Sequence, residues 1–169
     1  TLYQDVELLM PGNQKLGRPS EGKTIWHFDL PSVFSCLASA ECLKECYAHG
    51  KLFSFHQTRY ALNLEISQTA DFVSKIQEEI NRKDVEVLRP HVSGDFYSVE
   101  YCHKWLEIFD FNPELTFYLY TRSWQDQAMR LVFELMARLK NVHIWYSVDR
   151  SMMRPIVKHK RIRTCYMLA

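Results

Sequence analysis

The hydrophobic and polar positions of this chain follow two periods, which predicts strands separated by helices. β-rich segments of strand length occur at residues 24–30, 85–92, 115–120, 142–148 and 161–168. Between them, apolar residues recur at steps of three and four, as on one face of a helix, at residues 55–82, 98–109 and 125–139. The segment 55–82 holds neither Gly nor Pro, so we expect one continuous helix there.

This alternation favours βαβ units, in which parallel strands are joined by right-handed crossovers. We therefore predict an α/β fold, a partial (β/α) barrel with mainly parallel strands and a cysteine loop after its first strand. With 169 residues and 47% hydrophobic content, the chain suits one core. We expect a single domain over residues 1–169, with an irregular N-terminal arm at 1–23 and the cysteine loop at 31–50.

The overall charge excludes a global field that would recruit nucleic acid or an anionic membrane. There are 21 basic and 20 acidic residues, for a net charge of +1. No apolar run approaches the roughly 18 to 20 residues that span a bilayer, and the first thirty residues lack a secretory pattern. We expect a cytoplasmic protein without a membrane partner.

Three of the five cysteines fall within eleven residues, which favours metal or cluster ligation over a disulfide framework. Cys36, Cys42 and Cys46 are separated by five and three residues. Three thiolates can hold three irons of a 4Fe-4S cluster and leave the fourth iron open to a small ligand and to oxygen. The alternatives are zinc with His49 as fourth ligand, and buried free thiols.

Polar clusters follow three of the predicted strands. In parallel α/β folds the ligand site lies at the carboxyl ends of the strands, so these clusters should surround one cavity together with the cysteine loop. Asp95 and Asp149 could instead serve only as helix-entry residues. The candidate cofactor-binding residues are Ser93, Gly94, Asp95, Thr121, Arg122, Ser147 and Asp149.

A basic stretch from Arg150 to Arg163 could contact the phosphates of a nucleic acid. Such a run is more often a solvated face, and nucleic-acid binding is not the favoured interpretation.

Several motifs give the chain a family resemblance. It resembles the phage "gene product 88" proteins in Gly12-Asn13-x-Lys15-Leu16, in Trp26-x-Phe28-x-Leu30-Pro31, in the Cys36/Cys42/Cys46-Tyr47-Ala48 loop, in His91-Val92-Ser93-Gly94-Asp95-Phe96-Tyr97 and in Tyr120-Thr121-Arg122-Ser123. This family is similar, more distantly, to radical S-adenosylmethionine proteins, where a three-cysteine loop also follows the first strand. The spacing there is three then two residues, so the resemblance implies the cluster more directly than the radical chemistry.

The resemblance implies a 4Fe-4S cluster on the three loop cysteines, with S-adenosylmethionine as the ligand of the open iron. Such an amino-carboxylate needs partners for both of its charges, and Asp95 and Arg122 are the candidates. If phage-encoded, the protein would act in the host cytoplasm. Two other functions stay open: a zinc-stapled or cluster-stapled binding protein that contacts nucleic acid or a phage component, and an electron-transfer protein.

Overall fold

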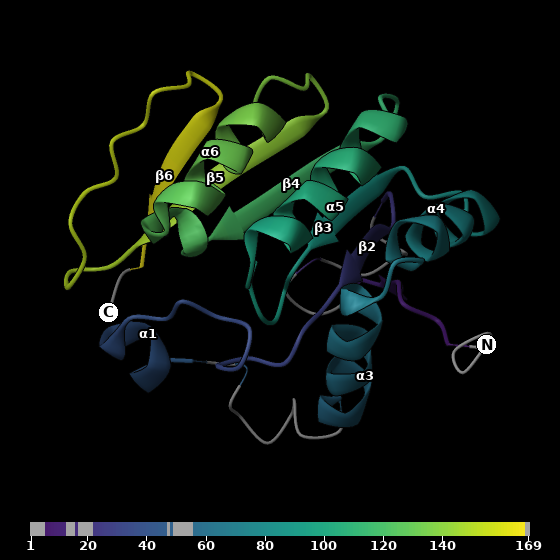
Figure 1. Ribbon diagram of the computed structural model, residues 1–169, viewed down its shortest axis with the longest axis horizontal. Helices are drawn as coiled ribbons and strands as arrows, with labels where there is room; N and C mark the ends of the chain where they lie inside the picture. The colour runs from purple at the N-terminus through teal and green to yellow at the C-terminus, as the bar shows by residue number, and fades with distance from the viewer. Residues whose placement is uncertain (1–5, 13–15, 17–21, 47, 49–55, 168–169) are drawn as a thin grey trace.

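A six-stranded sheet forms the centre of the computed structural model, which describes residues 6–12, 16, 22–46, 48 and 56–167 (Figure 1). The strands lie in the order in which they occur in the chain. β1 pairs antiparallel with β2, and every later pair is parallel. The strands are β1 (Met10–Pro11), β2 (Ile25–Phe28), β3 (Val87–Pro90), β4 (Thr116–Thr121), β5 (Val142–Val148) and β6 (Ile162–Tyr166).

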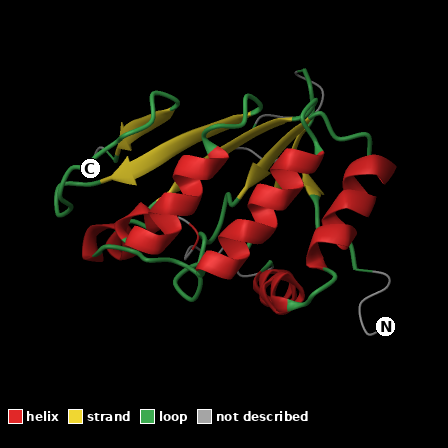
Figure 2. Ribbon diagram, turned by 45° about the horizontal axis from the view of Figure 1, so that its top comes forward, coloured by secondary structure: helices red, strands yellow, loops and turns green. Residues whose placement is uncertain are grey.

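The helices connect these strands and gather on one face of the sheet. Figures 1 and 2 show α4, α5 and α6 side by side across that face, as right-handed crossovers between consecutive parallel strands require. The helical elements are α1 (Ala40–Lys44), α3 (Gln57–Gln68), α4 (Phe72–Arg82), α5 (Val99–Phe111), the 3-10 turn η3 (Ser123–Gln125) and α6 (Gln127–Met136).

The prediction of a mixed α/β fold with mainly parallel strands is therefore confirmed. The sheet is open, with β1 and β6 as its two edges, so the strands do not close into a barrel. In the described part of the chain, no helix has the length and apolar character needed to cross a membrane.

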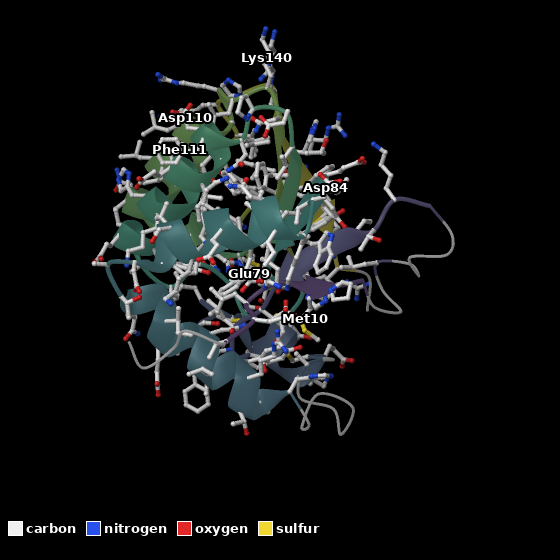
Figure 3. The ribbon with its side chains drawn as sticks, turned by 90° about the vertical axis from the view of Figure 1, so that its right-hand side faces the viewer. Met10, Glu79, Asp84, Asp110, Phe111 and Lys140 are labelled. Atoms are coloured by element: carbon white, nitrogen blue, oxygen red, sulfur yellow. The ribbon has the colours of Figure 1, made fainter. Side chains whose placement is uncertain are left out.

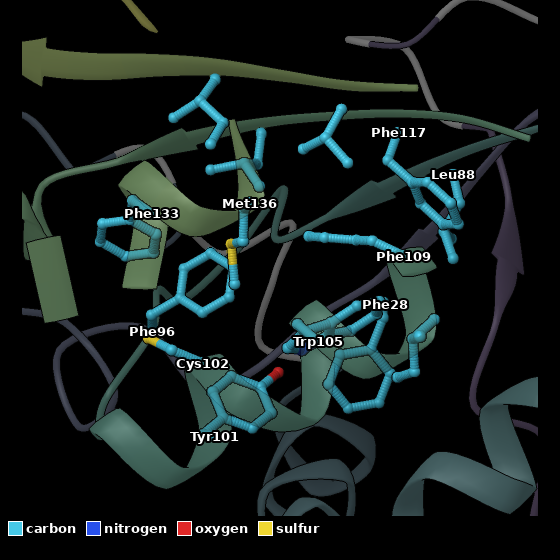
Figure 4. Packing of buried hydrophobic residues seen from close by; sticks show 14 of the residues in the cluster. Phe28, Leu88, Phe96, Tyr101, Cys102, Trp105, Phe109, Phe117, Phe133 and Met136 are labelled. Atoms are coloured by element: carbon cyan, nitrogen blue, oxygen red, sulfur yellow. The ribbon is translucent and has the colours of Figure 1, made fainter. Parts of the chain in front are cut away.

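The core lies between the sheet and its helices (Figure 4). Alternate residues of each strand point into it, so Leu88, Phe117 and Ile144 are fully buried, and Trp105 and Phe133 meet them from the helices. Because one face of the sheet is filled in this way, the side chains between these positions point to the opposite face.

One predicted element is wrong in its extent. The expected helix at 55–82 is two helices, α3 and α4, with Thr69 extended between them. The Thr69 hydroxyl donates to the Ile66 carbonyl at 2.7 Å, and the Lys104 ammonium donates to the carbonyls of Ser67 and Thr69, both at 3.0 Å. These groups satisfy the carbonyls that a continuing helix would have used.

The N-terminal arm is also more ordered than predicted over its described part. It contributes β1, and just before this strand the amides of Leu8 and Leu9 donate to the carboxylate of Glu79 on α4 at 2.5 and 2.9 Å. The Lys83 ammonium lies 2.9 Å from the same carboxylate. Figure 3 shows Glu79 next to Met10. The arm is thus fixed to α4 by hydrogen bonds from its backbone to the buried Glu79 carboxylate, whose charge Lys83 balances.

Candidate functional site

The carboxyl ends of the parallel strands and the cysteine loop enclose a cavity of about 580 Å³. Figure 1 shows α1, which belongs to the cysteine loop, beyond the end of the sheet to which β5 points. This is the arrangement that parallel strands impose, since their carboxyl ends share one edge. All three loop cysteines and six of the seven predicted cofactor-binding residues line it: Cys36, Cys42, Cys46, Ser93, Gly94, Asp95, Thr121, Arg122 and Ser147.

Gly94 brings the loop after β3 against the start of the cysteine loop. Its φ is +80°, a conformation that suits glycine. A Cβ at this position would lie 2.6 Å from the Cβ of Leu30 and 2.6 Å from the Oγ of Ser35. Glycine at this position therefore permits a close approach between two segments of the protein's own chain.

Asp95 is buried, and the protein itself occupies both of its carboxylate oxygens. Oδ1 accepts from the Phe96 amide and the Thr121 hydroxyl, and Oδ2 accepts from the Arg122 amide, each at 2.7 Å. Burial raises the pKa of Asp95 to about 6, although these hydrogen bonds act in the opposite direction. Asp95 does not cap α5, because Ser98 fills that role by accepting from the Tyr101 amide.

Asp149 links the cysteine loop to the sheet. It is the one predicted residue outside the cavity lining, and its Oδ2 accepts from the Arg122 guanidinium at 2.6 Å. The same oxygen accepts from the hydroxyl of Ser39, which in turn caps α1 by accepting from the Cys42 amide at 3.1 Å. The hydrogen bonds that Arg122 and Ser39 make to Asp149 therefore position the helix that carries Cys42. The Asp149 carboxylate also balances the charge of Arg122.

This link makes a prediction for pH dependence. Burial alone raises the pKa of Asp149, but the hydrogen bonds from Ser151 and Ser39 and the charge of Arg122 lower it to about 2. The folded pKa is thus below the unfolded one, so the carboxylate stabilises the fold above about pH 3.9 and loses this effect as the pH falls through about 2. We expect Asp149→Asn to lower the free energy of unfolding by roughly 2 kcal/mol at pH 7.

Urea unfolding of the parent and of Asp149→Asn at a series of pH values checks this. The difference in unfolding free energy between the two proteins should shrink toward zero as the pH falls to about 2 and below. The parent carboxyl then takes up a proton and becomes uncharged, like the asparagine amide. Equal stability of the two proteins at pH 7 would show that the link contributes nothing.

The three loop cysteines are partly buried. Burial, followed by the nearby Asp95 carboxylate, raises the pKa of Cys36 to about 12, and burial also raises the pKa of Cys42. Cys36 and Cys42 therefore stay protonated at neutral pH, and a bound metal would have to displace these protons.

The spacing of the three loop thiols bears on which kind of metal site they could form. Within the described residues, no three His, Cys, Asp or Glu side chains converge closely enough to hold a single ion. A cluster places each thiolate on a separate iron, so its ligands stand farther apart than those of one zinc ion. His49, the predicted fourth zinc ligand, lies outside the described residues.

Sequence reasoning missed Asp29, which follows β2 at the same edge of the sheet. It is buried, and its Oδ1 accepts from the amides of Val92 and Ser93 at 2.7 and 2.9 Å. Its Oδ2 lies 2.7 Å from Nδ1 of His27. Burial opposes ionisation, but these hydrogen bonds lower the pKa of Asp29 below its usual value. The strand predicted at 24–30 contains Asp29, so the rule that polar site residues follow the carboxyl ends of strands did not reach it; β2 ends one residue earlier, at Phe28.

The basic stretch forms the connection between β5 and β6 and part of β6 itself. Arg150, Arg154, Lys158 and Lys160 are exposed there, as a solvated face would be. Contact with nucleic acid stays a prediction.

Fold and site together define a class: an open, mainly parallel α/β protein with a cysteine loop over a cavity at the strand ends. The chain belongs to the family described as "Gene product 88", whose model matches residues 7–168. It is 31% identical over 131 residues to the "Gene 88 protein" of Mycobacterium phage L5, covering 69% of this chain and 53% of that protein. The chain thus spans about half the length of this relative. No solved structure matches it.

Proposed function

We propose that this chain is an iron-sulfur protein that holds a 4Fe-4S cluster on Cys36, Cys42 and Cys46, in a phage or phage-related setting and in the host cytoplasm. The observation that supports it is that all three loop cysteines line one cavity at the carboxyl ends of parallel strands. The open sheet then corresponds to part of a (β/α) barrel. When bound, the cluster would supply an iron without a protein thiolate, to which a small molecule can bind.

The chain's own residues would set the geometry of that cluster. Gly94 lets the loop after β3 contact the cysteine loop, and the Asp149 link holds α1 in place. Both act before any metal arrives, because their partners are protein groups. The cavity is thus preorganised, which is what a ligand site requires.

The finer part of the proposal is that S-adenosylmethionine binds the open iron, as in radical S-adenosylmethionine proteins. It is supported by cavity size, since about 580 Å³ lies in the usual range of roughly 300–1,000 Å³ for small-molecule sites. Asp95 and Arg122 remain near the ligand. However, the Asp95 carboxylate and the Arg122 guanidinium already make hydrogen bonds to protein groups. Their main effect would therefore be to hold the cavity wall in place, and they would make few direct hydrogen bonds to the ligand.

Paramagnetic resonance of the reduced cluster tests this finer part. Saturating S-adenosylmethionine should change the signal, because its amino-carboxylate would bind the open iron directly. Adenosine, which lacks the amino-carboxylate, is the matched control and should leave the signal as it was. A signal that S-adenosylmethionine leaves unchanged would favour the electron-transfer role, with the cluster still in place.

A further inference from the structure

The face of the sheet opposite α4, α5 and α6 carries a row of cationic and aromatic side chains. It runs across four neighbouring strands, from Arg89 on β3 through Tyr118 and Tyr120 on β4 to Trp145 on β5 and Arg163 on β6. The Tyr120 and Trp145 rings are stacked with their centroids 5.2 Å apart. Tyr120 is paired in register with Trp145, and Trp145 with Arg163. Figure 2 shows the helices on the other side of the sheet.

Arg89 differs from the rest of this row in being buried, with 7% of its surface exposed. Its guanidinium carbon lies 4.9 Å from the Tyr120 ring centroid and 5.7 Å from that of Tyr118. Its Nε is buried without a hydrogen-bond partner. Among the residues that the structure describes, no carboxylate lies within 4.0 Å of it, whereas Asp149 matches Arg122 at 2.6 Å.

A buried cation without a counter-charge is costly, and aromatic rings recover only part of that cost. Arg89 also lines the cavity, as do Tyr118 and Tyr120, together with the three loop cysteines. The missing counter-charge can therefore come from a molecule in the cavity. A guanidinium is suited to this task because its planar fork pairs with the two oxygens of a carboxylate or a phosphate.

We infer that Arg89 binds the oxyanion group, a carboxylate or a phosphate, of a small molecule that occupies this cavity. A nucleic-acid strand fits less well, because Arg89 lies over the Tyr118 and Tyr120 rings and Trp145 stacks on Tyr120, so protein side chains already engage these rings. The inference goes beyond the proposed cluster, since none of the contacts that carry it involves Cys36, Cys42 or Cys46.

Calorimetric titration of the metal-free protein with inorganic phosphate, and separately with acetate, at constant ionic strength tests the inference. The parent should bind at least one of them saturably, and which of the two binds tells phosphate from carboxylate. Arg89→Met should weaken that binding by about ten-fold or more. Arg163→Met is the matched control: this arginine lies over Trp145 at 5.5 Å but outside the cavity, so binding should be unchanged.

The melting temperature separates a binding role from a structural one. Without anion, Arg89→Met should melt at or above the temperature of the parent, because it removes an uncompensated buried charge. Arg89→Lys keeps the charge without the fork and should bind weakly. The inference is overturned if the parent binds neither anion, or if Arg89→Met binds as well as the parent. Repeating the titration with Cys36, Cys42 and Cys46 all changed to Ala keeps the result independent of the cluster proposal.

Discussion

Replacing Cys36, Cys42 or Cys46 by alanine is expected to remove the iron-sulfur chromophore, with the iron retained per chain falling to about a tenth or less. In the proposed cluster each thiolate would hold one iron, so losing one would open a second corner of the cluster to water. The three thiols line the same cavity from separate positions in the loop. We therefore expect that neither remaining thiolate can also bind the iron that the lost thiolate held. Absorbance near roughly 400 nm and iron content measure the outcome.

Cys102→Ala is the matched control, because Cys102 is fully buried in the apolar core between α5 and the sheet (Figure 4). It should keep the chromophore and cost about 1 kcal/mol of stability, as small core truncations do. A Cys42→Ala protein that still carried a full complement of iron would contradict the ligand assignment.

Gly94→Ala is expected to destabilise the fold by about 2–5 kcal/mol and to displace the cysteine loop. Two effects add. Alanine is strained at a φ of +80°, and its Cβ would overlap the Leu30 Cβ and the Ser35 Oγ, each 2.6 Å away. Ser35 cannot yield freely, because its hydroxyl donates to the Pro31 carbonyl at 2.8 Å and accepts from the Asp95 amide at 3.3 Å. Urea unfolding gives the magnitude.

Gly22→Ala separates these two effects. Gly22 also has a positive φ, of +150°, but nothing lies within 4 Å of a Cβ built there. It should therefore show backbone strain without overlap and cost less than Gly94→Ala. Equal losses from the two substitutions would mean that the contact between the β3 loop and the cysteine loop adds no constraint.

The sheet could be predicted from sequence because its strands have strong local signals. The segment 142–148 is β5 to the residue, the predicted strands at 24–30, 85–92 and 161–168 contain β2, β3 and β6, and the segment 115–120 covers β4 except for Thr121. Hydrophobic periodicity reports burial, and burial on a parallel sheet is what these segments share. The break between α3 and α4 has no such signal, since it depends on Lys104, which approaches Thr69 only in the folded chain.

The site divides in the same way. Its location followed from topology, because residues after parallel strands must meet at one edge. The pairing of charged side chains within the site did not follow from topology. Arg122 follows a strand end and was a candidate from the sequence, whereas Arg89 lies inside the strand predicted at 85–92 and was not. Only tertiary contacts reveal that Asp149 neutralises Arg122 and that no described carboxylate meets Arg89. Contact geometry therefore adds Arg89 as a second cation of the cavity, and a role for Arg122 at the ligand stays a prediction.

The iron, acid-labile sulfide and zinc contents of protein purified without oxygen distinguish a cluster from a zinc site. We expect a brown protein with iron and sulfide in equal amounts, approaching about four of each per chain, and with little zinc. A protein that contains zinc and no sulfide would contradict the cluster assignment. Such a protein would be colourless, because zinc has a filled d shell.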